Sequence, residues 1–147
     1  MQAIIESAQS SLILVFYAIT ESARPLVDSI AARARYGVRV TFCLDDSTGA
    51  LSTLARLWPE DTPSPRILLP NRQVWKEGNL HAKAIIADRK AALVTSANLT
   101  GWATDSNLEV GVRIDEELAR ELHDYVLTLL RSGALYVAEL PSTSRVG

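Results

Sequence analysis

The chain has little of several residue types, and each shortage excludes a class of protein. Cys43 is the only cysteine among 147 residues, so an intrachain disulfide and a cysteine-based zinc site built from this chain alone are excluded. Because it lies in an apolar, strand-like run, we expect a buried, unreactive thiol. The longest apolar run, Leu12–Ile19, is interrupted by Thr20 and Glu21. It falls short of the roughly 18 residues that a transmembrane helix needs, so no membrane partner is expected.

The chain also lacks a secretory leader and a strong charge imbalance. Residues 1–7 have neither the basic start nor the apolar centre of a signal peptide, which favours a cytoplasmic protein. The net charge of −2 excludes a broadly basic, nucleic-acid-binding surface. A local patch is compatible with that charge, because residues 71–113 contain six Lys or Arg and four Asp or Glu.

The composition is that of an ordinary globular domain. Hydrophobic residues make up 48% of the chain and charged residues 22%, and we find no internal repeat or low-complexity segment. We expect one domain over residues 1–140 and a loose tail over 141–147. Four of the six prolines fall within Pro59–Pro70, which indicates a surface connection inside the domain.

Apolar periodicity predicts alternating strands and helices. Residues 11–18 are typical of a strand covered on both faces, and a helix follows from Ser22 and Pro25 to Gly37. A second strand at 38–44 completes a βαβ unit with parallel pairing. Further along we expect a helix at 51–57, an extended piece at 66–69, paired strands at 83–87 and 91–95, a strand at 108–114, and a final helix from Asp115 to Gly133.

Four polar residues between these elements suit a phosphate. His81 and Lys83 stand two positions apart on an extended chain, so their side chains project to one face. Ser96 and Asn98 repeat this spacing at the end of a neighbouring strand. An imidazole can attack or donate a proton, whereas an ammonium and an amide can hold phosphoryl oxygens. Asp45 and Asp46, at the end of another strand, are better interpreted as helix caps than as magnesium ligands.

The chain here resembles the phospholipase D superfamily, whose signature is His-x-Lys, four residues, Asp, six residues and Gly-Ser-x-Asn. The positions that match in register are His81, Lys83, Asp88, Ser96 and Asn98. Glu109 stands where the superfamily has a carboxylate after the Asn, and the resemblance extends from about Ser11 to Ile114. Thr95 replaces the motif Gly. A positive φ there would strain a β-branched residue, but we expect the strand to tolerate it.

The resemblance implies an α/β fold with a mixed, largely parallel sheet flanked by helices on both faces. It also implies metal-independent, cofactor-free cleavage of a phosphodiester in two steps. His81 then forms a phosphohistidine in one subunit and acts as general acid in the other, while Lys83 and Asn98 bind phosphoryl oxygens. Glu109 orients an imidazole with support from Ser96. We interpret Asp88 chiefly as a turn residue.

Such chemistry needs two motifs, and this chain carries one. His123 is the only other histidine, and we interpret it as structural because it lies in the predicted final helix. The simplest completion is a symmetric homodimer in which two copies of His81 face each other. A second motif elsewhere in a longer protein is the alternative.

Three functions are compatible with this pattern. Single-motif members of the superfamily resemble nucleases, some of them in phage-defence systems, so a nuclease with nucleic-acid and defence-subunit partners is our first hypothesis. A phospholipid-acting enzyme is the second, although no amphipathic anchor is evident. The third is a non-catalytic dimerisation or nucleic-acid-binding module. Trp75 and Trp102 flank the motif, where base stacking and core packing are equally compatible roles.

Overall fold

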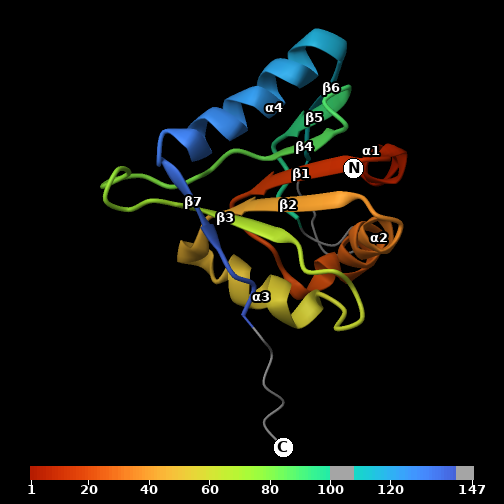
Figure 1. Cartoon of the computed structure of the whole chain (residues 1–147), viewed down its shortest axis with the longest axis horizontal. Helices are drawn as coiled ribbons and strands as arrows, with labels where there is room; N and C mark the ends of the chain where they lie inside the picture. The colour runs from red at the N-terminus through yellow and green to blue at the C-terminus, as the bar shows by residue number, and fades with distance from the viewer. Residues whose placement is uncertain (100–107, 142–147) are drawn as a thin grey trace, which may run out of the picture.

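A mixed sheet forms the centre of the computed structural model, which describes residues 1–99 and 108–141 (Figure 1). The strand order is β6-β5-β4-β1-β2-β3-β7. The strands are β1 Ser11–Phe16, β2 Arg39–Leu44, β3 Arg66–Pro70, β4 Ala84–Ala87, β5 Ala91–Thr95, β6 Gly111–Asp115 and β7 Leu135–Ala138.

The sheet is mixed, as the sequence predicted, but it is not largely parallel. Parallel pairing is limited to β1 with β2 and β2 with β3, and the other four adjacent pairs are antiparallel. The reason is the length of the connections. A helix joins β1 to β2 and another joins β2 to β3, whereas β4 and β5 are joined by a tight turn that allows only antiparallel pairing.

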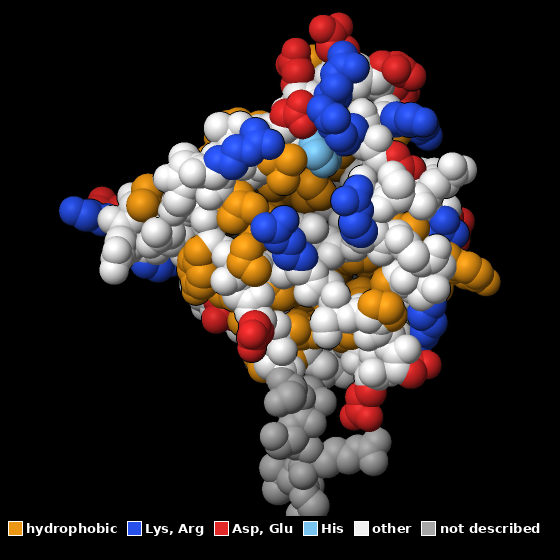
Figure 2. Space-filling view, in the orientation of Figure 1, with side chains coloured by type: hydrophobic (Ala, Val, Ile, Leu, Met, Phe, Trp, Pro, Cys, Tyr) orange, Lys and Arg blue, Asp and Glu red, His pale blue; other side chains and the backbone are white. Residues whose placement is uncertain are grey.

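Helices cover both faces of this sheet, which confirms the predicted layers. The helices are α1 Gln2–Ser7, α2 Arg24–Arg35, α3 Ala50–Leu57 and α4 Glu116–Arg131. In Figure 1, α4 lies above the strands, and α2 and α3 lie below them on the other side of the sheet. Figure 2 looks onto the α4 side, where apolar side chains are visible between α4 and the strands. No helix within the described ranges is long and apolar enough to cross a membrane.

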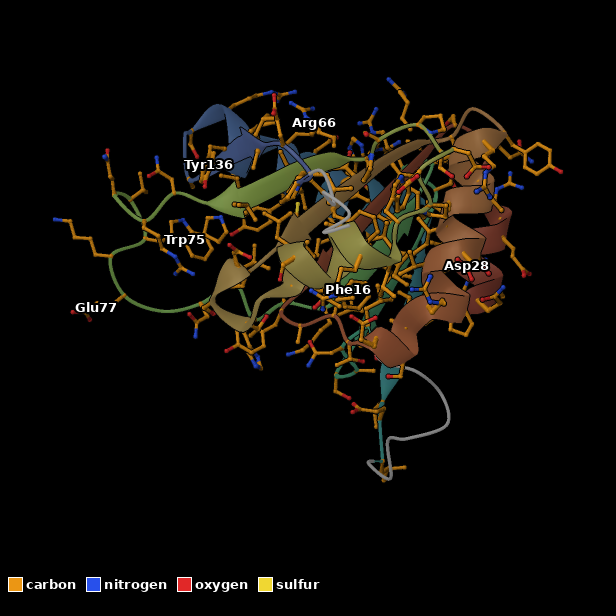
Figure 3. The ribbon with its side chains drawn as sticks, turned by 90° about the horizontal axis from the view of Figure 1, so that it is seen from below. Phe16, Asp28, Arg66, Trp75, Glu77 and Tyr136 are labelled. Atoms are coloured by element: carbon orange, nitrogen blue, oxygen red, sulfur yellow. The ribbon has the colours of Figure 1, made fainter. Side chains whose placement is uncertain are left out.

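Alternation along the strands builds one apolar cluster on each side of the sheet. In β1, Leu14 and Phe16 join the cluster beneath α2 and α3, whereas Val15 joins the cluster beneath α4. Figure 3 shows Phe16 on the α3 side. Cys43 also faces α4 and is 1% exposed. Burial raises the pKa of its thiol to about 12 despite the opposing effect of nearby Arg66, so the expected buried, unreactive thiol is confirmed.

The sequence patterns predicted most of the helices and strands, but they missed one strand and some element boundaries. β7 was not predicted; it pairs with β3 in an antiparallel register after α4 reverses the chain. β6 begins at Gly111 rather than Leu108. Asp115 stands at the N-cap of α4 but makes no side-chain capping bond, because its carboxylate binds Arg113 at 3.1 Å. The predicted loose tail falls mostly on residues 142–147, outside the described residues.

Candidate active site

His81 and Lys83 meet in the extended segment that leads into β4. Because Ala84 pairs with Val15, this segment lies beside the carboxyl end of β1. Lys83 Nζ lies 2.9 Å from His81 Nδ1 and donates to the His81 carbonyl oxygen at 2.9 Å. Lys83 Nζ also lies 3.3 Å from His81 Nε2, so the ammonium stands close to both ring nitrogens.

Lys83 is held in an unusual environment for a lysine. Its side chain is buried, with 8% of the residue exposed, whereas His81 is exposed. Burial lowers the pKa of Lys83, and the Glu109 carboxylate opposes this by favouring the charged form. The ammonium is therefore fixed within the cleft beside His81 rather than extended into solvent.

Tyr17 is a neighbour that the sequence did not indicate. Its ring centroid lies 4.7 Å from that of His81 at an interplanar angle of 48°. Lys83 Nζ lies 5.9 Å from the same tyrosine centroid. Tyr17 directly follows β1, so the only available signal was an aromatic residue at the end of the predicted central strand. The ring limits where the imidazole can rotate.

Ser96 and Glu109 form the second part of the site, after β5 and before β6. The Ser96 hydroxyl donates to a Glu109 carboxylate oxygen and accepts from the Val110 amide at 3.1 Å. Ser96 lines a cavity of about 450 Å³ together with His81 and Lys83. Within residues 1–99 and 108–141, no hydrogen bond joins Glu109 to His81 of the same chain. Glu109 therefore acts on this site through Ser96 and through its charge.

Asn98 binds the backbone that follows β1. Its Oδ1 accepts from the Ala18 amide at 3.2 Å, and an isolated parallel bridge joins Ile19 to Leu99 beside it. Using the amide oxygen in this way leaves the NH₂ group of Asn98 as the donating end. The segment carrying Asn98 is thereby tied to the same strand end that carries Tyr17.

Asp88 lies at the other end of β4, away from His81. Its carboxylate accepts from the backbone amides of Gln9, Ser10 and Ser11, each at 2.8 Å, and from the Ser10 hydroxyl. Burial opposes its ionisation, but these hydrogen bonds outweigh burial and hold its pKa below the usual value. Asp88 and Arg89 both have positive φ, as a type I′ turn between β4 and β5 requires.

Thr95 fits the strand without backbone strain. It lies in β5 and is absent from the residues with positive φ, which include Asp88 and Arg89. Its hydroxyl accepts from the Ala97 amide at 3.1 Å. Gly111 stands opposite Thr95 in the β5–β6 ladder, and a Cβ at Gly111 would approach the Thr95 Cβ to 3.3 Å. The strand accommodates the larger residue at 95 because its partner position is glycine.

Asp45 holds the chain immediately before His81, a role that the sequence did not reveal. It is fully buried at the end of β2. Its carboxylate accepts from the Leu80 amide at 2.7 Å and from Arg72 at 2.9 Å. Burial opposes its ionisation, but bonds from Ser47 and Leu80, with the charge of Arg72, lower its pKa. The predicted capping role is present, because Ser47 N donates to the Asp45 carboxylate at 3.0 Å. The bonds from Leu80 and Arg72 come in addition to it.

The remaining aromatic and histidine candidates lie elsewhere or outside the described residues. Trp75 packs against the apolar cluster beneath α4 and lines a cavity of about 260 Å³ that also reaches His81. Trp102 lies within residues 100–107, outside the described residues. His123 Nδ1 lies 2.9 Å from the carboxylate of Asp124 on α4. In the described part of the chain, no three His, Cys, Asp or Glu side chains gather as a metal site requires.

Comparison with known proteins finds a matching family model and a curated relative. A family model described as "Cardiolipin synthase, PLD-like domain" matches residues 1–130. DISARM protein DrmC of Bacillus paralicheniformis is 25% identical over 128 residues, which are 87% of this chain and 53% of that protein. The chain therefore spans about half the length of this curated relative.

Two solved structures share the fold over most of both chains. The phospholipase D family member Nuc from Salmonella typhimurium has a TM-score of 0.72 at 20% identity, covering 94% of this chain and 88% of that one. NucT from Helicobacter pylori has a TM-score of 0.74 at 20% identity, covering 93% and 87%. Both likenesses support the mixed sheet with flanking helices.

Proposed function

The chain belongs to the phospholipase D superfamily of phosphodiesterases, and from this premise we propose that it is a nuclease that cleaves phosphodiester bonds without a metal ion. The observation that carries the proposal is the convergence of His81 and Lys83 beside the cavity that Ser96 lines. An imidazole next to a buried ammonium provides a nucleophile and an anion-binding group at one point.

The proposed reaction proceeds in two displacements at phosphorus. The His81 imidazole attacks phosphorus, so a P–N bond forms while the P–O bond to the leaving group breaks. The His81 imidazolium of a second copy gives its proton to the leaving oxygen. That imidazole then takes a proton from water, whose oxygen attacks phosphorus and breaks the P–N bond. Lys83 and the NH₂ group of Asn98 stabilise the charge on the non-bridging oxygens in both steps.

The second imidazole comes from a homodimer in this proposal, and an apolar patch next to the site supports it. We define the edge patch as Val94, Leu108, Val110 and Val112. Leu108 is 94% exposed, Val110 66% and Val112 60%, and Val94 pairs with Val112 across the β5–β6 ladder. Val94 also lines the cavity beside His81. An exposed apolar patch on an edge strand favours association, and a second copy placed here brings its own His81 towards the cleft.

Nucleic acid is the proposed substrate, and other defence subunits are proposed partners. The fold neighbours are named Nuc and NucT, and the curated relative is named a DISARM protein. These names support the nuclease and defence-system hypotheses for this chain. The family description also names cardiolipin synthase, so transfer of a phosphatidyl group is the second candidate.

The test is cleavage in the presence of EDTA. We expect the purified protein to cleave single- or double-stranded DNA or RNA, together with bis(p-nitrophenyl) phosphate. His81→Ala should abolish both activities, whereas Asp28→Ala, a control at an exposed position on α2, should retain them. A covalent phospho-adduct that is labile in acid and stable in base should accumulate during turnover.

Three outcomes would count against this function. A requirement for added metal, or activity that survives His81→Ala, would contradict the mechanism. Phosphatidylglycerol vesicles form a parallel arm of the experiment. Turnover of this lipid with no turnover of nucleic acid would support the phosphatidyl-transfer candidate instead.

A further inference from the structure

A second cavity, of about 700 Å³, lies at the end of the sheet opposite His81. Its lining includes Ser11, Arg39 and Arg66, which are the first residues of β1, β2 and β3. The active site lies beside the carboxyl end of β1, so the two cavities occupy opposite ends of the parallel strands. We call this second cavity the arginine cleft. In Figure 2, basic side chains gather over β2 and β3 below α4.

We propose that the arginine cleft binds the phosphodiester backbone of a nucleic-acid strand at a distance from the cleavage site. This inference rests on the proposed nuclease function and extends it to a second substrate contact. It would let the protein hold a strand on the α4 face while His81 acts elsewhere on the same nucleic acid.

The two arginines are placed on one face by strand geometry. Arg66 pairs with Thr41, and Arg39 lies two residues before Thr41 on the same strand. Residues two apart on a strand share a face, so both arginines project to the α4 side. Figure 3 shows Arg66 on the side of the sheet opposite Phe16. Strand spacing puts their Cα atoms roughly 8 Å apart, within reach of neighbouring phosphates of one strand.

The positive charge of these arginines is not neutralised locally. No ion pair within the described ranges joins Arg39 or Arg66 to an acidic side chain, and both residues are exposed. The acidic groups nearby are already engaged. Asp88 accepts hydrogen bonds from the chain at residues 9–11, and Asp124 pairs with Arg89 at 2.7 Å. The lining thus contains three arginines, Arg39, Arg66 and Arg89, against the one carboxylate of Asp88, so the cleft carries net positive charge in a chain whose overall charge is −2.

Neutral donors and an apolar floor complete a surface suited to a sugar-phosphate backbone. Hydroxyl groups of Ser11, Thr41 and Ser64 lie in the lining, and Ile13 and Leu127 form apolar parts of it. Phosphate contacts in nucleic-acid complexes come from arginine, serine and threonine side chains of this kind. Recognition would be independent of base sequence, because these groups bind phosphate and sugar rather than base edges.

The experiment measures binding of a fluorescent single-stranded oligonucleotide to protein carrying His81→Ala, which prevents cleavage. In that background, Arg39→Glu and Arg66→Glu are compared with Arg24→Glu. Arg24 is an exposed arginine with no ion pair among the described residues, and it lies on α2 at the other face of the sheet. All three variants change the net charge equally, so a general electrostatic effect would weaken oligonucleotide binding by the same factor in each.

We expect Arg39→Glu and Arg66→Glu each to weaken binding about tenfold relative to Arg24→Glu. Each should also lower the slope of log K against log salt concentration by about 0.7, the value for one lost phosphate contact on a single strand. Arg39→Lys and Arg66→Lys should retain most of the affinity, and unchanged melting temperatures would exclude misfolding. Equal oligonucleotide affinity of all three Glu variants would contradict the proposed role of the arginine cleft. A loss of binding seen only with anionic phospholipid vesicles, and not with the oligonucleotide, would also contradict it.

A second readout separates this inference from the proposed function. With His81 intact, hydrolysis of bis(p-nitrophenyl) phosphate should be unchanged by Arg39→Glu and Arg66→Glu, because this small substrate does not reach the arginine cleft. Loss of oligonucleotide binding without any hydrolytic activity would support the cleft and contradict the nuclease. Hydrolysis with unchanged binding would contradict the cleft alone.

Discussion

Single side chains in the candidate active site are held by neighbours distant in sequence. Lys83 Nζ lies 2.9 Å from His81 Nδ1 and 5.9 Å from the centroid of the Tyr17 ring, and Asp45 accepts a hydrogen bond from the amide of the residue before His81. Asp45 is buried, whereas Arg72 is half-exposed. Loss of the ion pair would therefore leave a buried carboxylate without its partner, while Arg72 could still be hydrated by solvent. We infer that Asp45 is a positioning residue that sets where the His81 backbone runs.

Replacing Asp45 tests that role at the scale of one residue. Asp45→Asn keeps the shape but removes the charge that Arg72 and the Leu80 amide meet, so His81 should shift within the cleft. We expect kcat on bis(p-nitrophenyl) phosphate to fall about tenfold to a hundredfold with little change in KM, because misplaced reacting groups mainly slow the chemical step. Unfolding in urea should show a stability loss of about 1–3 kcal/mol.

The adjacent Asp46 provides the matched control for this change. Asp46 is exposed, and Asp46→Asn should leave kcat and stability near the wild-type values. If Asp45→Asn lost stability while its kcat stayed equal to that of Asp46→Asn, Asp45 would be a purely structural residue.

At the scale of elements, the sequence predicted those helices and strands that are specified by the residue pattern of their own segment. The unit β1-α2-β2 followed from a continuous apolar run, helical spacing and a stop at Gly37. β7 is four residues long, and its place depends on pairing with β3, which no local period specifies. The site divides in the same way. The convergence of His81 and Lys83 follows from the two-residue period, whereas Tyr17 and Asp45 reach it from other strands.

The turn between β4 and β5 gives an element-scale prediction for Asp88. Its carboxylate joins this turn to the start of β1 through bonds to three backbone amides. Asp88→Asn leaves one oxygen to accept and removes its charge, so we expect a stability loss of about 1–3 kcal/mol at pH 7. Asp28→Asn, at an exposed position on α2 labelled in Figure 3, should change stability little.

The effect of Asp88 should also depend on pH in a defined direction. Its pKa is lower in the folded chain than its ordinary value. The stabilisation is therefore complete above the ordinary carboxyl pKa of about 4 and is lost as the pH falls through the lower folded value. Urea unfolding at pH 7, 5 and 3 should show the gap between wild type and Asp88→Asn narrowing only at pH 3. A gap of constant size would contradict a charge-dependent role.

At the scale of the whole molecule, the two edges of the sheet differ in what they expose. β6 forms one edge, and the edge patch lies on β6, on the residues before it and on Val94 of β5, next to the candidate-site cavity; β7 forms the other edge, with Val137 53% exposed. In the proposed two-step reaction, a chain with one copy of the motif supplies half of the groups needed. Exposed apolar surface beside that incomplete site is where we expect a second copy to bind.

This prediction can be tested by changing one valine at each edge. Val112→Asp places a charge in the edge patch, so the protein should sediment as a monomer and lose at least about nine-tenths of its activity although His81 is intact. Val137→Asp makes the same change on the β7 edge and should stay dimeric and active.

A second measurement of the dimer uses mixed chains. Because each active dimer would need two His81 side chains, co-refolding wild-type protein with an equal amount of His81→Ala should halve the activity of the wild-type chains. Activity that is unchanged by the mixing, or a Val112→Asp monomer that cleaves at the wild-type rate, would show that one chain is sufficient for catalysis.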